Sequence, residues 1–383
     1  MKKLFLLLLL MVAVSAHATE NPVLTIEGGQ VQGVLADDHP DVYVYRGIPY
    51  AAPPIRENRW REPQPIVPWK GVKICDTFGR PSYQAIQYTG GYYTEWGYGK
   101  EAAFSEDCLY LNVWTKAPGQ IDKKLPVALW IHGGGYREGF GSEPEFDGQE
   151  WGAKDVVLVS INYRLGVFGF LIHPALTAES PHHVSGNYGI LDQIEALKWI
   201  KKNIAQFGGD PDNVTIFGQS AGGGSVRTLC ESPLARGLFH KAVIMSAQGL
   251  SIPDANGNMV GGRYSGGTFA DAEAKAKKMF DWAGLTDLEK MRAASTETVF
   301  ALNTLYHQIN SDGQPAGMPM MFRGLPFMPM IDGYVSEKSF DDATRGGTLA
   351  DVPYMIGFTL NDMGNMAPNI AEFCKVREQK GGK

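Results

Sequence analysis

The chain has 383 residues, of which 44% are hydrophobic and 20% are charged. A chain of this kind can bury a large core, and α/β folds of this length often form one domain. The formal net charge is −6 with both signs interspersed, so the sequence lacks both the basic stripe expected of a nucleic-acid-binding protein and the like-charge block typical of a disordered tail.

The N-terminus has the pattern of an export signal. Two lysines precede an apolar run from Leu4 to Val14, and Ala16-His17-Ala18 follows it. The run is too short to span a bilayer, and A-x-A is a typical cleavage site. We therefore expect residues 1–18 to be a signal peptide cleaved after Ala18, and residues 19–383 to form a secreted or periplasmic domain without a membrane span.

Short strands and a long aromatic stretch come next. Runs at 24–26 and 31–34, separated by glycines, predict a hairpin, and 42–45 predicts another strand. Residues 83–98 alternate aromatic side chains with glycines and have neither a helical nor a strand period. Their rings either pack on the surface or line a substrate pocket. The candidates for such a pocket are Tyr92, Tyr93 and Trp96.

The middle of the chain alternates predicted strands with predicted helices. Apolar runs without alternation occur at 127–131, 156–161, 214–217 and 242–245, as expected of strands buried on both faces of a parallel sheet. A helical stripe precedes the third run and consists of Ile190, Ile194, Leu197, Ile200 and Ile204. A further helical region is expected over 271–291. The pattern predicts an α/β fold with a mostly parallel central sheet flanked by helices.

The strongest chemical signal is Gly218-Gln219-Ser220-Ala221-Gly222, directly after the strand predicted at 214–217. This G-x-S-x-G pattern needs small residues because the serine lies on a sharp turn between strand and helix, where a Cβ would collide with neighbouring backbone. A serine exposed at a helix N-terminus is placed for attack on a carbonyl carbon. Ser220 is therefore the predicted nucleophile.

A second motif, His132-Gly133-Gly134-Gly135-Tyr136, follows the strand predicted at 127–131. Successive glycines allow consecutive N–H groups to point at one spot. In hydrolases with a serine elbow, that spot holds the carbonyl oxygen as it becomes negative. The predicted donors are the amides of Gly134, Gly135 and Ala221.

The cysteine and histidine spacings indicate neither a metal site nor a particular disulfide pairing. No C-x-x-C or H-E-x-x-H spacing occurs, so no metal site is expected, and serine acyl transfer needs no cofactor. The cysteines allow three pairings, which spacing alone leaves open. They are Cys75, Cys108, Cys230 and Cys374.

Several motifs together resemble type-B carboxylesterases, the carboxylesterase and cholinesterase family. They are Glu106 to Val113, the glycine motif after Ile131, Asn162-Tyr163-Arg164, Phe207 to Pro211 and the serine elbow. The likeness runs from about Val31 to at least Met363. It implies an α/β-hydrolase fold and a serine carboxylic ester hydrolase that forms an acyl-enzyme on Ser220 with a small-molecule ester. It leaves the ester and the oligomeric state open.

The resemblance also implies a catalytic acid in a motif similar to G-x-x-x-D-E-G after a late strand. Here the strand is predicted at 352–356, and Gly357 to Gly364 forms the turn. Counting from Gly357 places Asp362 at the acid position, whereas counting back from Gly364 places Met363 there. Asp362 is preferred because only a carboxylate can orient and stabilise a histidine.

The family's catalytic histidine is expected far beyond the acid, yet no histidine follows Asp362. The histidines between Ser220 and that acid, His240 and His307, would need the wrong chain order and are interpreted as structural. We therefore expect the hydrolase domain to lack its C-terminal part. This polypeptide by itself should then be weakly active or inactive, because serine without a base keeps its proton.

Two alternatives remain open. A non-catalytic, neuroligin-like binding protein could use the same fold, although the retained Ser220 and its glycine motif favour an enzyme; a peptidase is not favoured by the motifs.

The family's usual disulfide joins the Cys108 position to a cysteine that would fall near Ser82, where this chain has none. A Cys75–Cys108 bridge and two free thiols are both compatible with the sequence.

Overall fold

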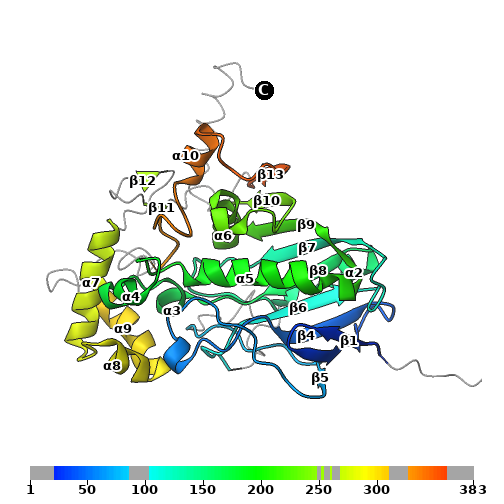
Figure 1. Ribbon diagram of the computed structural model, residues 1–383, viewed down its shortest axis with the longest axis horizontal. Helices are drawn as coiled ribbons and strands as arrows, with labels where there is room; N and C mark the ends of the chain where they lie inside the picture. Colours follow the sequence, from blue (N-terminus) through cyan, green and yellow to red (C-terminus); the bar gives the residue numbers. More distant parts are fainter. Residues whose placement is uncertain are drawn as a thin grey trace, which may run out of the picture.

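A computed structural model describes residues 21–85, 103–247, 252–253, 259–260, 268–309 and 327–359. The expected signal peptide, the aromatic candidates Tyr92, Tyr93 and Trp96, and both candidate acids lie outside these ranges. The described part is built on one large twisted sheet with helices packed on it (Figure 1).

The large sheet has eight strands in the order β13-β10-β9-β7-β8-β6-β4-β3. The five strands from β13 to β8 run parallel, and β6, β4 and β3 add an antiparallel half. The predicted α/β sheet with a parallel core is thus confirmed. The strands are β3 Val34–Leu35, β4 Tyr43–Pro49, β6 Tyr110–Thr115, β7 Leu125–Ile131, β8 Val157–Ile161, β9 Gly209–Gln219, β10 Lys241–Met245 and β13 Tyr354–Gly357.

Two small sheets accompany it. The predicted hairpin forms from β1 (Val23–Ile26) and β2 (Gly29–Gln32), which pair antiparallel, and β5 (Val72–Ile74) joins β2 in parallel. The short strands β11 (Ile252–Pro253) and β12 (Met259–Val260) pair antiparallel with each other.

The two faces of the large sheet are covered by different helices. On one face α5 (Tyr188–Asn203) and α6 (Ala221–Glu231) pack on the parallel strands, with the predicted isoleucine and leucine stripe of α5 inside the main core. On the other face α2 (Gln149–Ala153) packs against β6 and β8, over a smaller cluster that includes Trp114 and Trp130. Parallel strands buried on both faces need no polar alternation, which explains their continuous apolar runs.

The remaining helices lie beside this core (Figure 1). Instead of one helical region over 271–291 there are two helices, because Gly284 with φ +74° ends the first of them in the left-handed conformation. The capping box of Thr268 and Asp271 begins it. The helices are α3 Gly166–Phe170, α4 Pro174–Glu179, α7 Phe269–Trp282, α8 Leu288–Ala293, α9 Thr296–Ile309 and α10 Phe340–Arg345.

A buried ion pair fixes the loop that leaves β8. The Arg164 guanidinium donates to both carboxylate oxygens of Asp192 at 2.8 and 2.6 Å, and the Arg164 backbone N–H donates to the same carboxylate at 3.0 Å. Both side chains are at most 2% exposed. Because Asp192 is on α5, this pair ties the end of β8 to the helix that leads into β9. None of the helices in the described ranges is long and apolar enough to cross a membrane.

Candidate active site

Ser220 occupies a strained turn between β9 and α6. β9 ends at Gln219 and α6 begins at Ala221, so Ser220 alone makes the connection, with φ 55° and ψ −120°. Positive φ is rare for a residue with a side chain and costs on the order of 1–3 kcal/mol unless its surroundings enforce it. Two backbone hydrogen bonds do so: the Ser220 N–H donates to Met245 at 3.0 Å, and its carbonyl accepts from Gly224 at 2.9 Å.

The glycines on both sides of Ser220 are required by close backbone approaches. A Cβ on Gly218 would lie 2.5 Å from the carbonyl carbon of Gly222. A Cβ on Gly222 would lie 2.0 Å from the carbonyl oxygen of Ile131, the last residue of β7. The elbow is therefore pressed against the end of the neighbouring strand, which explains why the pattern requires glycine there.

The glycine loop begins at that same strand end and lies beside the serine. Gly134, Gly135 and Tyr136 have φ values of 87°, 62° and 60°. A Cβ on Gly133 would lie 2.7 Å from the Gln219 carbonyl oxygen and 3.4 Å from the Ser220 Cβ. The structure thus brings the two sequence motifs together.

Ser220 is accessible at this junction. It is partly exposed, and its hydroxyl has no hydrogen-bond partner among the residues that the structure describes. Ala221 provides the first backbone N–H of α6, one of the amides that a helix cannot satisfy internally.

The topology explains why the motifs meet. After β7 the chain passes to the face that holds α2, whereas after β9 it enters α6 on the opposite face. Neighbouring parallel strands whose connections leave to opposite faces open a crevice at their carboxyl ends, which is where open α/β sheets bind ligands. Ser220 and the glycine loop follow the carboxyl ends of these two neighbouring strands.

The acid candidate follows the edge of the same sheet. β13 pairs in parallel with β10, and the Ser246 N–H donates to the Gly357 carbonyl at 2.8 Å, so the chain leaves β13 at the edge where Ser220 lies. Asp362 comes three residues after Thr359, where the description ends, and its assignment remains a prediction. The pocket assignments of Tyr92, Tyr93 and Trp96 also stay predictions.

His240 lies at the wrong end of the sheet to serve Ser220. The His240 backbone N–H donates to the Val214 carbonyl at 2.7 Å, and the His240 ring Nδ1 accepts from the Val214 backbone N–H at 3.2 Å. Val214 precedes Ser220 by six residues on an extended chain, a separation of about 20 Å. This placement supports the structural interpretation of His240. His307 lies on α9, and its side chain is outside the described part.

The histidine at the start of the glycine loop is buried and neutral, which the sequence did not indicate. His132 is fully buried, its ring stacks on Tyr163 at 4.3 Å between centroids, and burial lowers its pKa to about 4. Tyr163 also donates from its hydroxyl to the His132 carbonyl at 2.9 Å. Tyr163 belongs to the motif Asn162-Tyr163-Arg164, but the motif does not predict its contacts with His132.

Cys75, Cys108 and Cys230 are buried free thiols in this structure, so the structure has no Cys75–Cys108 bridge. Burial raises the pKa of Cys75 to about 12 and also raises that of Cys108, which keeps both thiols protonated.

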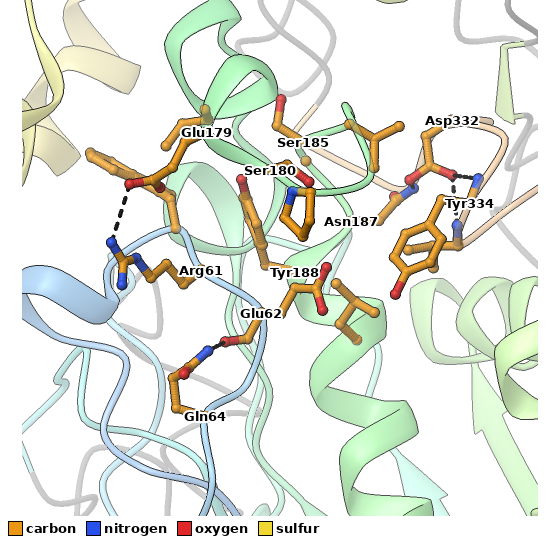
Figure 2. Close-up of a pocket in the computed structure, with 17 residues that line it drawn as sticks. Arg61, Glu62, Gln64, Glu179, Ser180, Ser185, Asn187, Tyr188, Asp332 and Tyr334 are labelled. Atoms are coloured by element: carbon orange, nitrogen blue, oxygen red, sulfur yellow. Dashed lines mark hydrogen bonds and ion pairs between the residues drawn. The ribbon is translucent and has the colours of Figure 1, made fainter.

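A pocket of about 320 Å³ lies apart from the elbow, between residues 60–64, the region 176–191 and residues 332–335 (Figure 2). Arg61 points toward Glu179, 3.2 Å away, at one side, and Tyr334 stands at the other. No residue of the serine elbow or of the glycine loop lines it. We therefore do not assign the chemistry of Ser220 to this pocket.

The fold and the paired motifs define an α/β-hydrolase architecture. The sequence model of the carboxylesterase family matches residues 20–381. The chain belongs to the carboxylesterase family.

Two relatives show the degree of similarity. The chain is 36% identical over 345 residues to fumonisin B1 esterase of Sphingopyxis macrogoltabida, covering 89% of this chain and 57% of the relative. It is 44% identical over 343 residues to para-nitrobenzyl esterase of Bacillus subtilis strain 168, covering 89% of this chain and 63% of the relative. The chain thus spans about 57–63% of the length of these curated relatives.

Solved structures of esterases superimpose on most of this chain. A PNB esterase structure superimposes with a TM-score of 0.72 at 32% identity, covering 88% of this chain and 63% of that one. A carboxylesterase of Geobacillus stearothermophilus superimposes with a TM-score of 0.70 at 33% identity, covering 92% and 66%.

Proposed function

We propose that this protein is a secreted serine carboxylic ester hydrolase with Ser220 as its nucleophile. The observation that carries the proposal is the close approach of two motifs: Gly133 lies against Gln219 and the Ser220 Cβ, at the carboxyl ends of adjacent parallel strands. The positive φ of Ser220 supports it further, because strain of this kind persists where function requires it.

The proposed reaction has two halves. The Ser220 oxygen attacks the ester carbonyl carbon, and the carbonyl oxygen becomes negative as the tetrahedral intermediate forms. The amides of Gly134, Gly135 and Ala221 donate to that oxygen, and one donor of this kind contributes about 3 kcal/mol to transition-state stabilisation. The alcohol then leaves with a proton, and water attacks the acyl-enzyme to release the acid and restore the serine hydroxyl.

Proton transfer is assigned only in part. Asp362 is the proposed acid that orients a histidine, but no histidine follows His307 in the chain. Without an imidazole the serine keeps its proton and is a weak nucleophile. We propose further that residues 19–383 belong to one hydrolase domain, which is exported with a signal peptide that is cleaved behind Ala18.

The printed names of the relatives, fumonisin B1 esterase and para-nitrobenzyl esterase, support an ester as the substrate. Tyr92, Tyr93 and Trp96 are proposed contacts for an apolar or aromatic part of it.

A fluorophosphonate probe tests the nucleophile. The probe should label the protein at Ser220, and Ser220→Ala should abolish labelling. Ser180→Ala is the matched control, since Ser180 lines the separate pocket, and it should label like the parent protein. Labelling that survives Ser220→Ala would contradict the proposal. Robust p-nitrophenyl ester turnover that depends on Ser220 would contradict the expectation of slow turnover.

The alternative to an enzyme is a non-catalytic binding protein on the same fold. Complete inertness toward the probe, together with no Ser220-dependent turnover, would support either this alternative or a missing general base. The retained elbow and glycine loop support the enzyme.

A further inference from the structure

The glycine loop is followed by a return turn that packs against the loop's own beginning. The turn contains Gly139, with φ +102°, at which a Cβ would lie 2.4 Å from the His132 Nδ1 and 3.0 Å from the Gly133 carbonyl oxygen. Gly139 is therefore in van der Waals contact with the base of the loop. Any displacement of Gly139 moves the support on which the Gly133 peptide rests.

Gln84 holds this glycine by both of its backbone groups. The Gln84 Oε1 accepts from the Gly139 N–H at 2.9 Å, and the Gln84 Nε2 donates to the Gly139 carbonyl at 3.0 Å. Nε2 also donates to the Ser82 carbonyl at 3.0 Å. The side chain is only 4% exposed, so these bonds are shielded from competing water. Gln84 is 55 residues away from Gly139 in sequence, so it fixes the turn from outside.

Other groups hold the two ends of the same segment. At its start, the Tyr163 hydroxyl donates to the His132 carbonyl at 2.9 Å. At its end, the Gly141 N–H donates to the Asn162 Oδ1 at 2.7 Å, and the Gly141 carbonyl accepts from the Ser160 hydroxyl at 2.5 Å. Gln84 acts between these anchors, in the turn itself, and completes a framework of buried polar side chains around the glycine loop.

We propose that Gln84 is a positioning residue for the oxyanion donors, an inference that rests on the function proposed above. Gln84 bonds Gly139, Gly139 supports Gly133, and Gly133 precedes the proposed donors Gly134 and Gly135. Such donors act only when they lie about 2.7–3.1 Å from the developing oxyanion, so a displacement of about 1 Å removes much of their effect. The carbonyl oxygen needs these donors most in the transition state, so loss of Gln84 slows acylation and leaves ester binding largely unchanged.

The test compares three variants with the parent protein. Gln84→Met keeps the length of the side chain and removes both bonds to Gly139. Gln84→Glu keeps the acceptor for the Gly139 N–H and loses the donor to its carbonyl at neutral pH. Gln64→Met is the matched control, because among the described residues the Gln64 Nε2 donates, at 2.8 Å, only to the carbonyl of its near neighbour Glu62.

The first readout is hydrogen exchange of the backbone amides in 133–139, which needs no enzymatic activity. Gln84→Met should speed exchange in this segment about tenfold or more, with no change in the strands of the sheet. Gln64→Met should leave it unchanged. Unchanged exchange in Gln84→Met, or equal acceleration over the whole protein, would overturn the positioning role.

The second readout is the rate of Ser220 labelling by the fluorophosphonate, whose phosphoryl oxygen must enter the same donors. Gln84→Met should label about tenfold more slowly than the parent. With a p-nitrophenyl ester, kcat should fall by a similar factor while KM changes less than about twofold. A change confined to KM would overturn the proposal.

Gln84→Glu supplies a rescue test and covers the case in which Gln84→Met does not fold. As the pH falls toward 5, protonation gives this carboxyl a donor for the Gly139 carbonyl. Its labelling rate relative to the parent should rise over that range, and a ratio that does not depend on pH would count against the mechanism. If the parent itself is not labelled at all, the proposed function fails, whereas the exchange experiment still decides whether Gln84 positions the loop.

Discussion

One row of side chains across the large sheet shows how differently its centre and its β13 edge are built. Trp130 on β7, Phe217 on β9, Val243 on β10 and Met355 on β13 occupy successive positions in register. Trp130 is only 2% exposed, Phe217 and Val243 are half-buried, and Met355 is 68% exposed. The same face of the same sheet therefore changes from core to surface within four strands.

This difference teaches where the protein can tolerate change. The proposed nucleophile lies near the buried centre, where Gly218 and Gly222 have no room for a methyl group and close packing maintains the strained Ser220. At the β13 edge the described residues give no such confinement: a Cβ on Gly357 would meet none of them within 4 Å, and Ile356 and Phe358 are 62% and 41% exposed. Matched substitutions at the centre and at this edge test the comparison.

The largest difference is expected between two identical substitutions of glycine. Gly222→Ala places a Cβ 2.0 Å from the Ile131 carbonyl oxygen and should destabilise the fold by more than about 5 kcal/mol or prevent folding, despite the better helix propensity of alanine. Gly357→Ala should change the free energy of unfolding by no more than about 0.5 kcal/mol. Urea denaturation followed by tryptophan fluorescence measures both. Comparable losses of stability would disprove the difference between the centre and the β13 edge.

The next effect concerns ion pairs. Asp192→Asn leaves the fully buried Arg164 guanidinium without its counter-charge and should cost about 4 kcal/mol. Asp212→Asn removes the partner of Lys201 in an exposed pair and should give no measurable change. Thermal unfolding of the two variants in parallel measures the stability that each of them loses. A small loss of stability for Asp192→Asn would show that other contacts hold the loop after β8.

Side-chain truncation sharpens the comparison further. Leu129→Ala on β7 removes a fully buried side chain and should cost about 3 kcal/mol, because it leaves a cavity in the core. Met355→Ala on β13 should cost no more than about 0.5 kcal/mol, because its side chain is mostly in water already. Urea denaturation measures the two losses in free energy of unfolding, from the shift of each midpoint at an unchanged m-value. A larger loss for Met355→Ala would mean that the β13 edge is covered in solution.

The smallest of the four effects depends on pH and involves Glu231, the last residue of α6, which links that helix to the segment leading to α10. Burial, as the largest cause, and the nearby Asp332 and Glu337 carboxylates together raise the pKa of Glu231 to about 8, against hydrogen bonds from the Ser336 hydroxyl and the Lys338 N–H, which lower it. Between the unfolded pKa of about 4.5 and the folded pKa of about 8, the folded protein keeps a proton that the unfolded chain releases. Stability from this group is therefore complete below pH 4.5 and is lost as the pH rises to 8.

Glu231→Gln has no such titration. Its free energy of unfolding relative to the parent should increase by about 2 kcal/mol between pH 5 and pH 7. Urea titrations at several pH values measure the difference, and all other titrating groups cancel because both proteins contain them. A difference that stays constant with pH would mean that the Glu231 carboxyl titrates alike in the folded and unfolded states.

The sequence predicted the elements whose physics is local. Continuous apolar runs predicted the parallel strands, and the helical stripe of α5 was visible from its period. The break between α7 and α8 was missed because Gly284 was not recognised as a helix end. The sequence did not predict the burial of His132 or the hydrogen bonds between Gln84 and Gly139, because each depends on residues distant in the chain.

By itself the sequence determined the family, the α/β class and the two glycine-dependent motifs, because glycine is required wherever backbones approach too closely for a Cβ. Only the tertiary structure decided that these motifs lie side by side, that His240 lies at the opposite end of the strands from Ser220, and that the centre of the sheet is confined while its β13 edge reaches solvent. Strand order and the face to which each connection turns produced those results, and they arise from packing between segments that no local pattern records.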